Sequence, residues 1–217
     1  MILRPDLNTF AILPWTVDSE DVTARLICDV HLPDGSPYEG CPRQILKRQL
    51  AEAAKLGYEF NVGPELEFFL FKRDEEGNPI PVPHDSAGYF SQYDDFALEL
   101  RRLAAFDLDA LGIEIERMHH EVAPGQHEIN FRYSNAVRSA DNVVSFKLAL
   151  KDMAARAGLH ASFMPKPIFG VNGSGMHVHQ SLSQIADGKN AFYDPQGTYG
   201  LSPLAQSFIA GQLEHIR

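Results

Sequence analysis

Asn61-Val-Gly-Pro-Glu-Leu-Glu-Phe-Phe-Leu-Phe-Lys72 is the stretch that decides the fold. This apolar run, rich in aromatic residues, predicts a strand, in which alternate side chains point to opposite faces. Glu65 and Glu67 therefore share one face, and the apolar residues between and after them lie on the other. A lone pair of glutamates at this spacing is more often a solvated strand face. Burying two like charges is costly unless a cation joins them, so the apolar surroundings here favour metal ligation.

The elements around this strand predict an α+β fold. Helices are expected over residues 42–57, 94–111, 141–158 and 203–217. Further strands are expected over residues 9–15, 23–32, 113–118, 127–133, 160–164 and 174–182, with a long loop over 73–93. Several strands follow one another without a crossover helix. This order favours a mainly antiparallel sheet over a doubly wound parallel one.

The helical periodicity also predicts which residues face the core. Asp94 or Asp95 is expected to cap the second helix. The expected core-facing residues of that helix are Phe96, Leu100, Leu103, Leu108 and Leu111. Those of the third helix are Val143, Leu150, Met153 and Ala157.

Composition narrows the class of protein. The 217 residues suit one domain, and 44% apolar with 22% charged residues is ordinary for a soluble globular protein. A formal charge of −10 argues against nucleic acid as a partner, although Mg²⁺ or Mn²⁺ would still allow ATP to bind. Cys28 is expected to be a buried strand thiol. Its spacing from Cys41 fits no zinc or disulfide pattern, and proteins without disulfides are typical of the reducing cytoplasm, so we expect a cytoplasmic protein. No apolar run is long enough to cross a bilayer, which predicts no membrane partner.

A second acidic stretch runs from Glu116 to Glu128. A turn at Pro124-Gly125 separates Glu121 from Glu128, so a hairpin would bring both carboxylates to one point. The nearby histidines, His119, His120 and His127, could also be ligands, although such residues more often hydrogen-bond around a site. Oxygen ligands with few histidines suit Mg²⁺ or Mn²⁺ better than Zn²⁺.

The third stretch is Asn172-Gly-Ser-Gly-Met-His-Val-His-Gln-Ser181. Its glycines would let a ligand approach the backbone closely, while His177 and His179 point to one face of a strand with Ser181 in step. A glycine-rich turn alone is weak evidence. Together with four glutamates and paired histidines, it predicts a metal-dependent enzyme that handles a phosphorylated nucleotide.

At these residues the chain resembles the catalytic domain of type I glutamine synthetase. The resemblance rests on Gly63-Pro-Glu-Leu-Glu-Phe-Phe69, on His119-His-Glu-Val-Ala-Pro-Gly-Gln-His-Glu128, and on Phe163-Met-Pro-Lys-Pro167 followed by the glycine-rich turn. Arg4-Pro-Asp-Leu-Asn-Thr9 and Pro33-Asp-Gly-Ser-Pro37 match as well, so the likeness spans essentially the whole chain. We therefore expect residues 1–217 to form part of that catalytic domain.

The resemblance implies an ATP-dependent ligation of ammonia to the γ-carboxylate of glutamate, through a γ-glutamyl phosphate, to form glutamine. It assigns one divalent ion to Glu67, Glu121 and Glu128, and a second to Glu65 and His177. Glu67, Glu121, Glu128 and His177 would be the catalytic set. Glu116, Tyr133, His179 and Ser181 would line the ATP site, and Asn172 with Gly173 would contact glutamate.

The family also has segments for which no counterpart is expected here. A small β-grasp domain would precede Arg4, and further arginines and another metal-binding glutamate would follow Arg217, in subunits that form large rings. The chain alone is therefore expected to be inactive and to expose apolar patches around residues 203–217. Two alternatives stay open: a related γ-glutamyl-amine ligase, and a non-catalytic assembly protein or inert fragment on the same fold.

Overall fold

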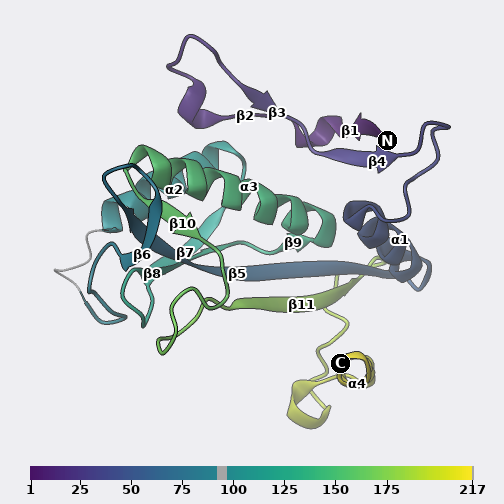
Figure 1. Ribbon diagram of the computed structural model, residues 1–217. Coiled ribbons are helices and arrows are strands. Elements are labelled where there is room, and N and C mark those ends of the chain that lie inside the picture. Colours follow the sequence, from purple (N-terminus) through teal and green to yellow (C-terminus); the bar gives the residue numbers. More distant parts are fainter. Residues whose placement is uncertain (92–96, 217) are drawn as a thin grey trace.

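The computed structural model describes residues 1–91 and 97–216, and its centre is a seven-stranded sheet (Figure 1). The strands run in the order β10-β5-β8-β7, and β6, β9 and β11 also pair with β5. Every pairing is antiparallel, so the predicted α+β fold with an antiparallel sheet is confirmed. The strands are β5 (Tyr58–Arg73), β6 (Pro79–Pro83), β7 (Ile115–His120), β8 (Gln126–Phe131), β9 (Ser134–Asn135), β10 (His160–Ser162) and β11 (Met176–Gln184).

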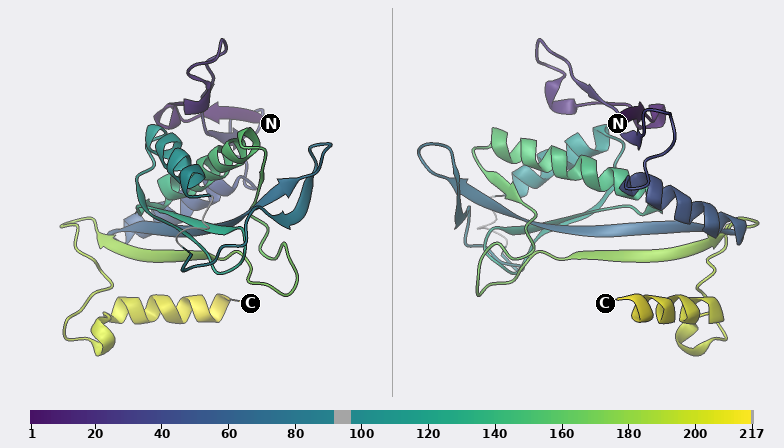
Figure 2. Two further views of the ribbon diagram at one scale, coloured as in Figure 1. Left: turned by 90° about the vertical axis from the view of Figure 1, so that its left-hand side faces the viewer. Right: turned by 45° about the vertical axis from the view of Figure 1, so that its right-hand side comes forward.

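Two helices cover one face of this sheet, α2 (Leu98–Ala110) and α3 (Ala136–Arg156) (Figures 1 and 2). The even-numbered residues of β5 pack against them: Leu66, Phe68 and Leu70 form one cluster with Phe146 and Leu150 of α3. Burying each such side chain contributes roughly 1.5–3 kcal/mol. Since alternate residues point the other way, the core on this face leaves Glu65 and Glu67 on the opposite one, as predicted.

Helices α1 (Pro42–Lys55) and α4 (Pro203–His215) begin and end near their predicted limits, whereas α3 does not. Helix α1 has proline in its first turn and is followed by Gly57 in the left-handed region, at φ 88°. Helix α3 starts earlier than the periodicity indicated, because the side chain of Asn135 accepts a hydrogen bond from the backbone of Arg138. Helix α4 is capped by Ser202 in the same way.

Two of the core assignments were wrong, whereas Leu108, Leu150 and Met153 are buried as predicted. Leu103 is 55% exposed, and Arg101 and Ala104 are buried on α2 beside Leu108. Ala157 follows the end of α3 and is exposed. The expected cap at Asp94 or Asp95 and the expected core residue Phe96 lie outside the described residues.

The segment expected to be a loop over residues 73–93 contains strand β6. Its three prolines lower the strand signal in the sequence, but β6 pairs only with the far end of β5, where prolines are tolerated at a sheet edge.

The first forty residues form two small sheets beside α1 and α3 (Figure 1). Strand β1 (Ile2–Pro5) pairs with β4 (Cys28–His31), and β2 (Ala11–Ile12) pairs with β3 (Ala24–Arg25), so the predicted strands over 9–15 and 23–32 are shorter than expected. Cys28 is half-buried on β4, and Cys41 is the buried thiol.

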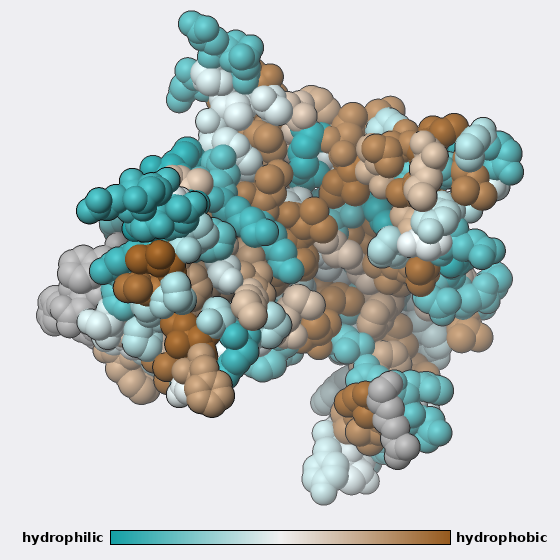
Figure 3. All heavy atoms as spheres, in the orientation of Figure 1, coloured by the Kyte–Doolittle hydropathy of each residue, from teal (hydrophilic) through white to brown (hydrophobic). Residues whose placement is uncertain are grey.

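Helix α4 lies below β11, on the side of the sheet opposite to α2 and α3 (Figure 2). Phe208 of α4 contacts Phe60 of β5 and Phe192, while Ile209 and Leu213 remain exposed. The space-filling view shows this segment standing away from the body, and hydrophobic residues gathered across the middle of the face between it and the N-terminal sheets (Figure 3). Within the described residues, we find no helix of the length and hydrophobicity that a membrane span requires.

Candidate functional site

Glu65 meets two histidines of the neighbouring strand β11. His177 lies directly across from it in the strand register, and His179 follows on the same face. His177 Nδ1 lies 3.4 Å from Glu65 Oε2, and His179 Nε2 lies 3.0 Å from Glu65 Oε1. The predicted convergence of these histidines on one face of a strand is therefore confirmed.

Strands β7 and β8 form the hairpin that brings Glu121 and Glu128 together. Gly125 turns the chain in the left-handed region, at φ 67°, and a Cβ there would lie 2.9 Å from Cβ of Pro83. Potential ligand atoms of His119, Glu121 and Glu128 lie within 4.8 Å of one another. The expected meeting of the two carboxylates is confirmed, and His119 joins them.

Glu67 faces this hairpin from β5, directly across from Glu128 in the strand register. Burial is the largest cause of a raised pKa of the Glu121 carboxyl; the backbone hydrogen bond from Val122 and the charge of His119 oppose it, and the charges of Glu67 and Glu128 raise the pKa further. Among residues 1–91 and 97–216, no lysine or arginine forms an ion pair with these three glutamates. The cluster is thus an acidic site whose repulsion a divalent cation would relieve.

Gln126 is a functional candidate that sequence reasoning missed. Its buried amide group donates to Glu67 Oε2 at 2.7 Å and to the carbonyl of Gly173 at 2.9 Å, and its oxygen accepts from the backbone of Ala123 at 3.3 Å. All of its hydrogen-bonding groups are engaged, so it fixes the Glu67 carboxylate to the glycine-rich turn. A sequence signal existed, because Gln126 and Glu128 share one face of β8 by strand alternation.

The glycine-rich turn packs against the protein itself. A Cβ at Gly173 would lie 2.3 Å from the carbonyl oxygen of Pro165, and one at Gly175 would lie 3.0 Å from Glu67 Oε1. Gly173 is therefore needed for the close approach of the chain's own backbone, and Gly175 leaves room for the Glu67 carboxylate. The expected approach of a ligand to these glycines stays a prediction. The neighbouring Asn172 is exposed.

A cavity of about 290 Å³ opens beside Glu65. Three of the four residues expected at an ATP site line it, namely Glu116, Tyr133 and His179. Ser181 lies two residues farther along β11 and is outside the lining. The cavity volume is at the low end of small-molecule sites.

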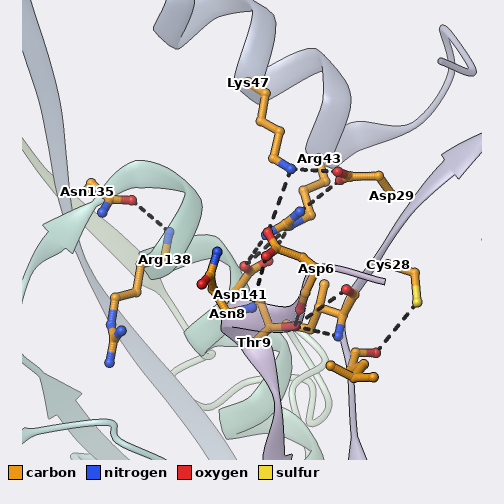
Figure 4. Close-up of polar contacts among 12 residues, drawn as sticks. Asp6, Asn8, Thr9, Cys28, Asp29, Arg43, Lys47, Asn135, Arg138 and Asp141 are labelled. Carbon is orange, nitrogen blue, oxygen red and sulfur yellow. Dashed lines mark hydrogen bonds and ion pairs between the residues drawn. The ribbon is translucent and has the colours of Figure 1, made fainter. Parts of the chain in front are cut away.

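A second group of carboxylates lies where the N-terminal segment meets α1 and α3 (Figure 4). Arg43 of α1 reaches Asp6 at 2.7 Å, Asp29 at 2.9 Å and Asp141 at 2.9 Å, and Lys47 adds a contact to Asp29 at 2.6 Å. The Arg43 side chain is only 10% exposed. This Arg43 cluster joins three separate parts of the chain.

Comparison with known proteins places these features in context. A family model described as "Glutamine synthetase, catalytic domain" matches residues 39–217. Glutamine synthetases from Clostridium saccharobutylicum and Thermus thermophilus are each 55% identical to this chain, covering 100% and 99% of it but only 48% and 49% of their own lengths. The chain thus spans about half the length of these curated relatives.

Solved structures give the same answer for the fold. The structure described as "Apo GmaS without ligand" superposes with a TM-score of 0.88 at 34% identity, covering 99% of this chain and 50% of that one. A cryo-electron microscopy structure of Plasmodium falciparum glutamine synthetase gives 0.87 at 26% identity, covering 99% of this chain and 47% of the other. The division into domains stays a prediction.

Proposed function

The chain belongs to the glutamine synthetase family, and from that premise we propose that it carries part of the active site for ATP-dependent ligation of ammonia to glutamate. Glutamate's γ-carboxylate would attack the terminal phosphate of ATP and displace ADP, and ammonia would then displace phosphate from the resulting γ-glutamyl phosphate and lose a proton to give glutamine. The observation that carries the proposal is the pairing of two acidic clusters on one face of β5. Glu65 with His177 forms one, and Glu67 with the β7–β8 hairpin forms the other.

The donor atoms fit divalent cations such as Mg²⁺ or Mn²⁺. Glu67, Glu121 and Glu128 would hold a first ion, and Glu65 with His177 a second. The raised pKa of Glu121 supports this assignment, because burial is its main cause, the charges of Glu67 and Glu128 add to it, and no lysine or arginine among the described residues pairs with these glutamates. When bound, such ions supply positive charge against phosphate oxygens, which favours phosphoryl transfer chiefly by positioning and electrostatics.

The protein's own residues would orient the substrates around these ions. Glu116, Tyr133 and His179 line the cavity beside Glu65, which suits a nucleotide whose phosphates point toward that carboxylate. Ser181 stays in the proposed ATP site only as a neighbour farther along β11. Asn172 and Gly173 are proposed to contact glutamate, since the carbonyl of Gly173 is tied through Gln126 to Glu67.

The whole protein's partners follow from the family. We propose glutamate, ammonia and ATP as substrates, a homo-oligomeric ring as the assembly, and the cytoplasm as the compartment. The free thiols Cys28 and Cys41 are compatible with reducing conditions.

Metal titration tests the proposal directly. We expect Mn²⁺ to bind wild type at two sites, with the first site tighter because it has the fuller ligand set. Glu121→Gln should weaken the first site by about tenfold or more, and His177→Ala should weaken only the second. Isothermal titration calorimetry and the electron paramagnetic resonance signal of free Mn²⁺ would measure both.

Glu52→Gln is the matched control, since it makes the same change on the exposed face of α1, where Glu52 pairs with Lys55. It should leave both sites unchanged. Equal Mn²⁺ affinity in wild type and Glu121→Gln would remove Glu121 from the metal site.

A further inference from the structure

Asp85 is a buried carboxylate behind the β7–β8 hairpin, and its side chain has no exposed surface. Its Oδ1 accepts a hydrogen bond from the backbone N–H of Gly125 at 3.0 Å. The same oxygen lies 3.1 Å from Nε2 of His120, the last residue of β7. Asp85 thus holds both the turn of the hairpin and the residue that precedes Glu121.

A chain of buried side chains continues from Asp85 to β8. Its Oδ2 lies 3.0 Å from His84 Nε2, and that nitrogen lies 2.9 Å from His127 Nε2. Nδ1 of His127 faces Arg101 Nη1 at 2.8 Å. Since arginine can only donate, His127 accepts at Nδ1, and its Nε2 is left to carry the proton toward His84. His127 is the residue next to Glu128, so the network reaches both ends of the hairpin.

These residues could instead be read as a metal site of their own. Potential ligand atoms of His84, Asp85 and His127 do lie within 4.8 Å of one another. However, the guanidinium of Arg101 is bonded to His127, and a second cation beside it in a buried setting would be repelled. Hydrogen bonds also already engage Asp85 Oδ1, with Gly125 and His120, and both ring nitrogens of His127, with His84 and Arg101.

We propose that Asp85 is a positioning residue for the first metal site. By fixing Gly125 and His120, it sets the spacing at which Glu121 and Glu128 face Glu67. The carbonyl of Gly125 is held from β5, because it accepts a hydrogen bond from the N–H of Leu70 at 2.8 Å. Asp85 holds the N–H of the same residue. The inference rests on the proposed metal assignment and adds a residue with no direct contact to the ion.

Mn²⁺ titration of Asp85→Ala and Asp85→Asn tests this role. Removing groups that orient metal ligands typically costs about 10–100-fold in affinity, and we expect that loss for Asp85→Ala at the first site only. Asp85→Asn keeps an acceptor for Gly125 but loses the charge that faces His120, so its loss should be smaller. The second site, formed on β5 and β11, should change less than about twofold in both variants.

Asp74→Ala provides the matched control, because Asp74 also accepts a backbone N–H in a turn, from Asn78 at 2.6 Å, but this hydrogen bond is exposed to solvent. Equal losses at both metal sites in an Asp85 variant would indicate general loosening of the fold and overturn the inference, and so would an unchanged first site. If Asp85→Ala does not fold, Asp85→Asn is the deciding variant. Weaker Mn²⁺ binding at the first site alone supports the inference, and equal losses at both sites or an unchanged first site overturn it.

A metal-free measurement separates this inference from the proposed function. Amide hydrogen exchange at Gly125 should be faster in Asp85→Ala than in wild type, while exchange in β11 should be unchanged. Failure of wild type to bind Mn²⁺ would overturn the metal assignment, whereas unchanged exchange at Gly125 would overturn only the role of Asp85.

Discussion

Three aspartates meet around Arg43, and three glutamates meet at the β7–β8 hairpin, yet the two groups differ in what balances their charge. At the Arg43 cluster, one arginine contacts Asp6, Asp29 and Asp141, with Lys47 beside them. At the hairpin, the nearest basic group recorded among the described residues is His119, 3.4 Å from Glu121 and 3.7 Å from Glu128. The Arg43 cluster contains its own cationic side chains, whereas no lysine or arginine among the described residues pairs with the glutamates of the hairpin.

The pKa shifts reflect this difference. The hydrogen bond from Arg43 lowers the pKa of Asp6, and for Asp29 the bonds from Lys47 and Arg43 outweigh the effect of burial, which alone would raise it. Burial and neighbouring carboxylates instead raise the pKa of Glu121. Shifted pKa values of this kind are more frequent at functional sites, so the contrast is the one we expect between a structural junction and the proposed cation site.

The largest expected effect comes from removing the cation of the Arg43 cluster. Arg43→Met would remove the cation shared by three mostly buried carboxylates and leave only Lys47 beside Asp29 and Asp6. Breaking such a group typically costs about 3–5 kcal/mol. Urea unfolding followed by circular dichroism would measure the loss. We expect the N-terminal sheets to separate first from α1 and α3, because Arg43 joins those parts.

Lys55→Met is the control for this change, since Lys55 pairs with Glu52 on an exposed helix surface. Its effect should stay below about 1 kcal/mol. Similar stability of Arg43→Met and wild type would show that the Arg43 cluster is not the junction we describe.

Neutralising one carboxylate in each group should have opposite effects on the metal-free chain. Asp141→Asn removes a charge-assisted hydrogen bond to Arg43 and should lower the free energy of unfolding by about 2 kcal/mol. Glu121→Gln relieves repulsion and should raise it by a few tenths to about 1 kcal/mol. Thermal unfolding in the presence of a chelator would measure both changes.

Whether Glu121→Gln raises or lowers the free energy of unfolding of the metal-free chain decides whether the hairpin glutamates differ from the Arg43 cluster as we describe. Added Mn²⁺ should reverse it, because the ion stabilises wild type more than the variant with the weakened site. Destabilisation by Glu121→Gln without metal would mean that this carboxylate is already compensated within the protein.

Strand alternation explains how much of the site could be predicted from the sequence. A period of two was enough to place Glu65 and Glu67 on one face and His177 with His179 on another strand's common face. The Pro124-Gly125 turn was enough to bring Glu121 to Glu128. These are short-range regularities of the backbone, and they do not depend on which strands are neighbours.

Contacts between distant segments could not be predicted in this way. Asp85 lies 40 residues from Gly125, and Arg43 lies 98 residues from Asp141, so no local pattern connects them. On α2 the periodicity correctly predicted that Leu108 is buried but was wrong for Leu103, which is exposed. Arg101 is buried instead, with His127 of β8 as a partner. Tertiary partners of polar residues decide these positions.

The smallest expected effect is the pH dependence of the Arg43 cluster. Because Arg43 lowers the pKa of Asp6, the folded chain keeps this carboxylate ionised at pH values where the unfolded chain takes up a proton. The stabilisation is therefore fully present above the ordinary pKa of 3.8 and is lost as the pH falls through the lower, folded value. Asp6→Asn should lower the free energy of unfolding by up to about 1 kcal/mol near pH 6, and the gap from wild type should begin to narrow once the pH falls below about 3.8 and close only below the folded pKa of Asp6. Asp187→Asn, which removes a carboxylate from an exposed pair with Lys189, should show little gap at any of these pH values. A gap for Asp6→Asn that does not narrow at any pH below 3.8 at which the chain stays folded, measured by urea unfolding, would mean that Arg43 does not hold Asp6 in its ionised form.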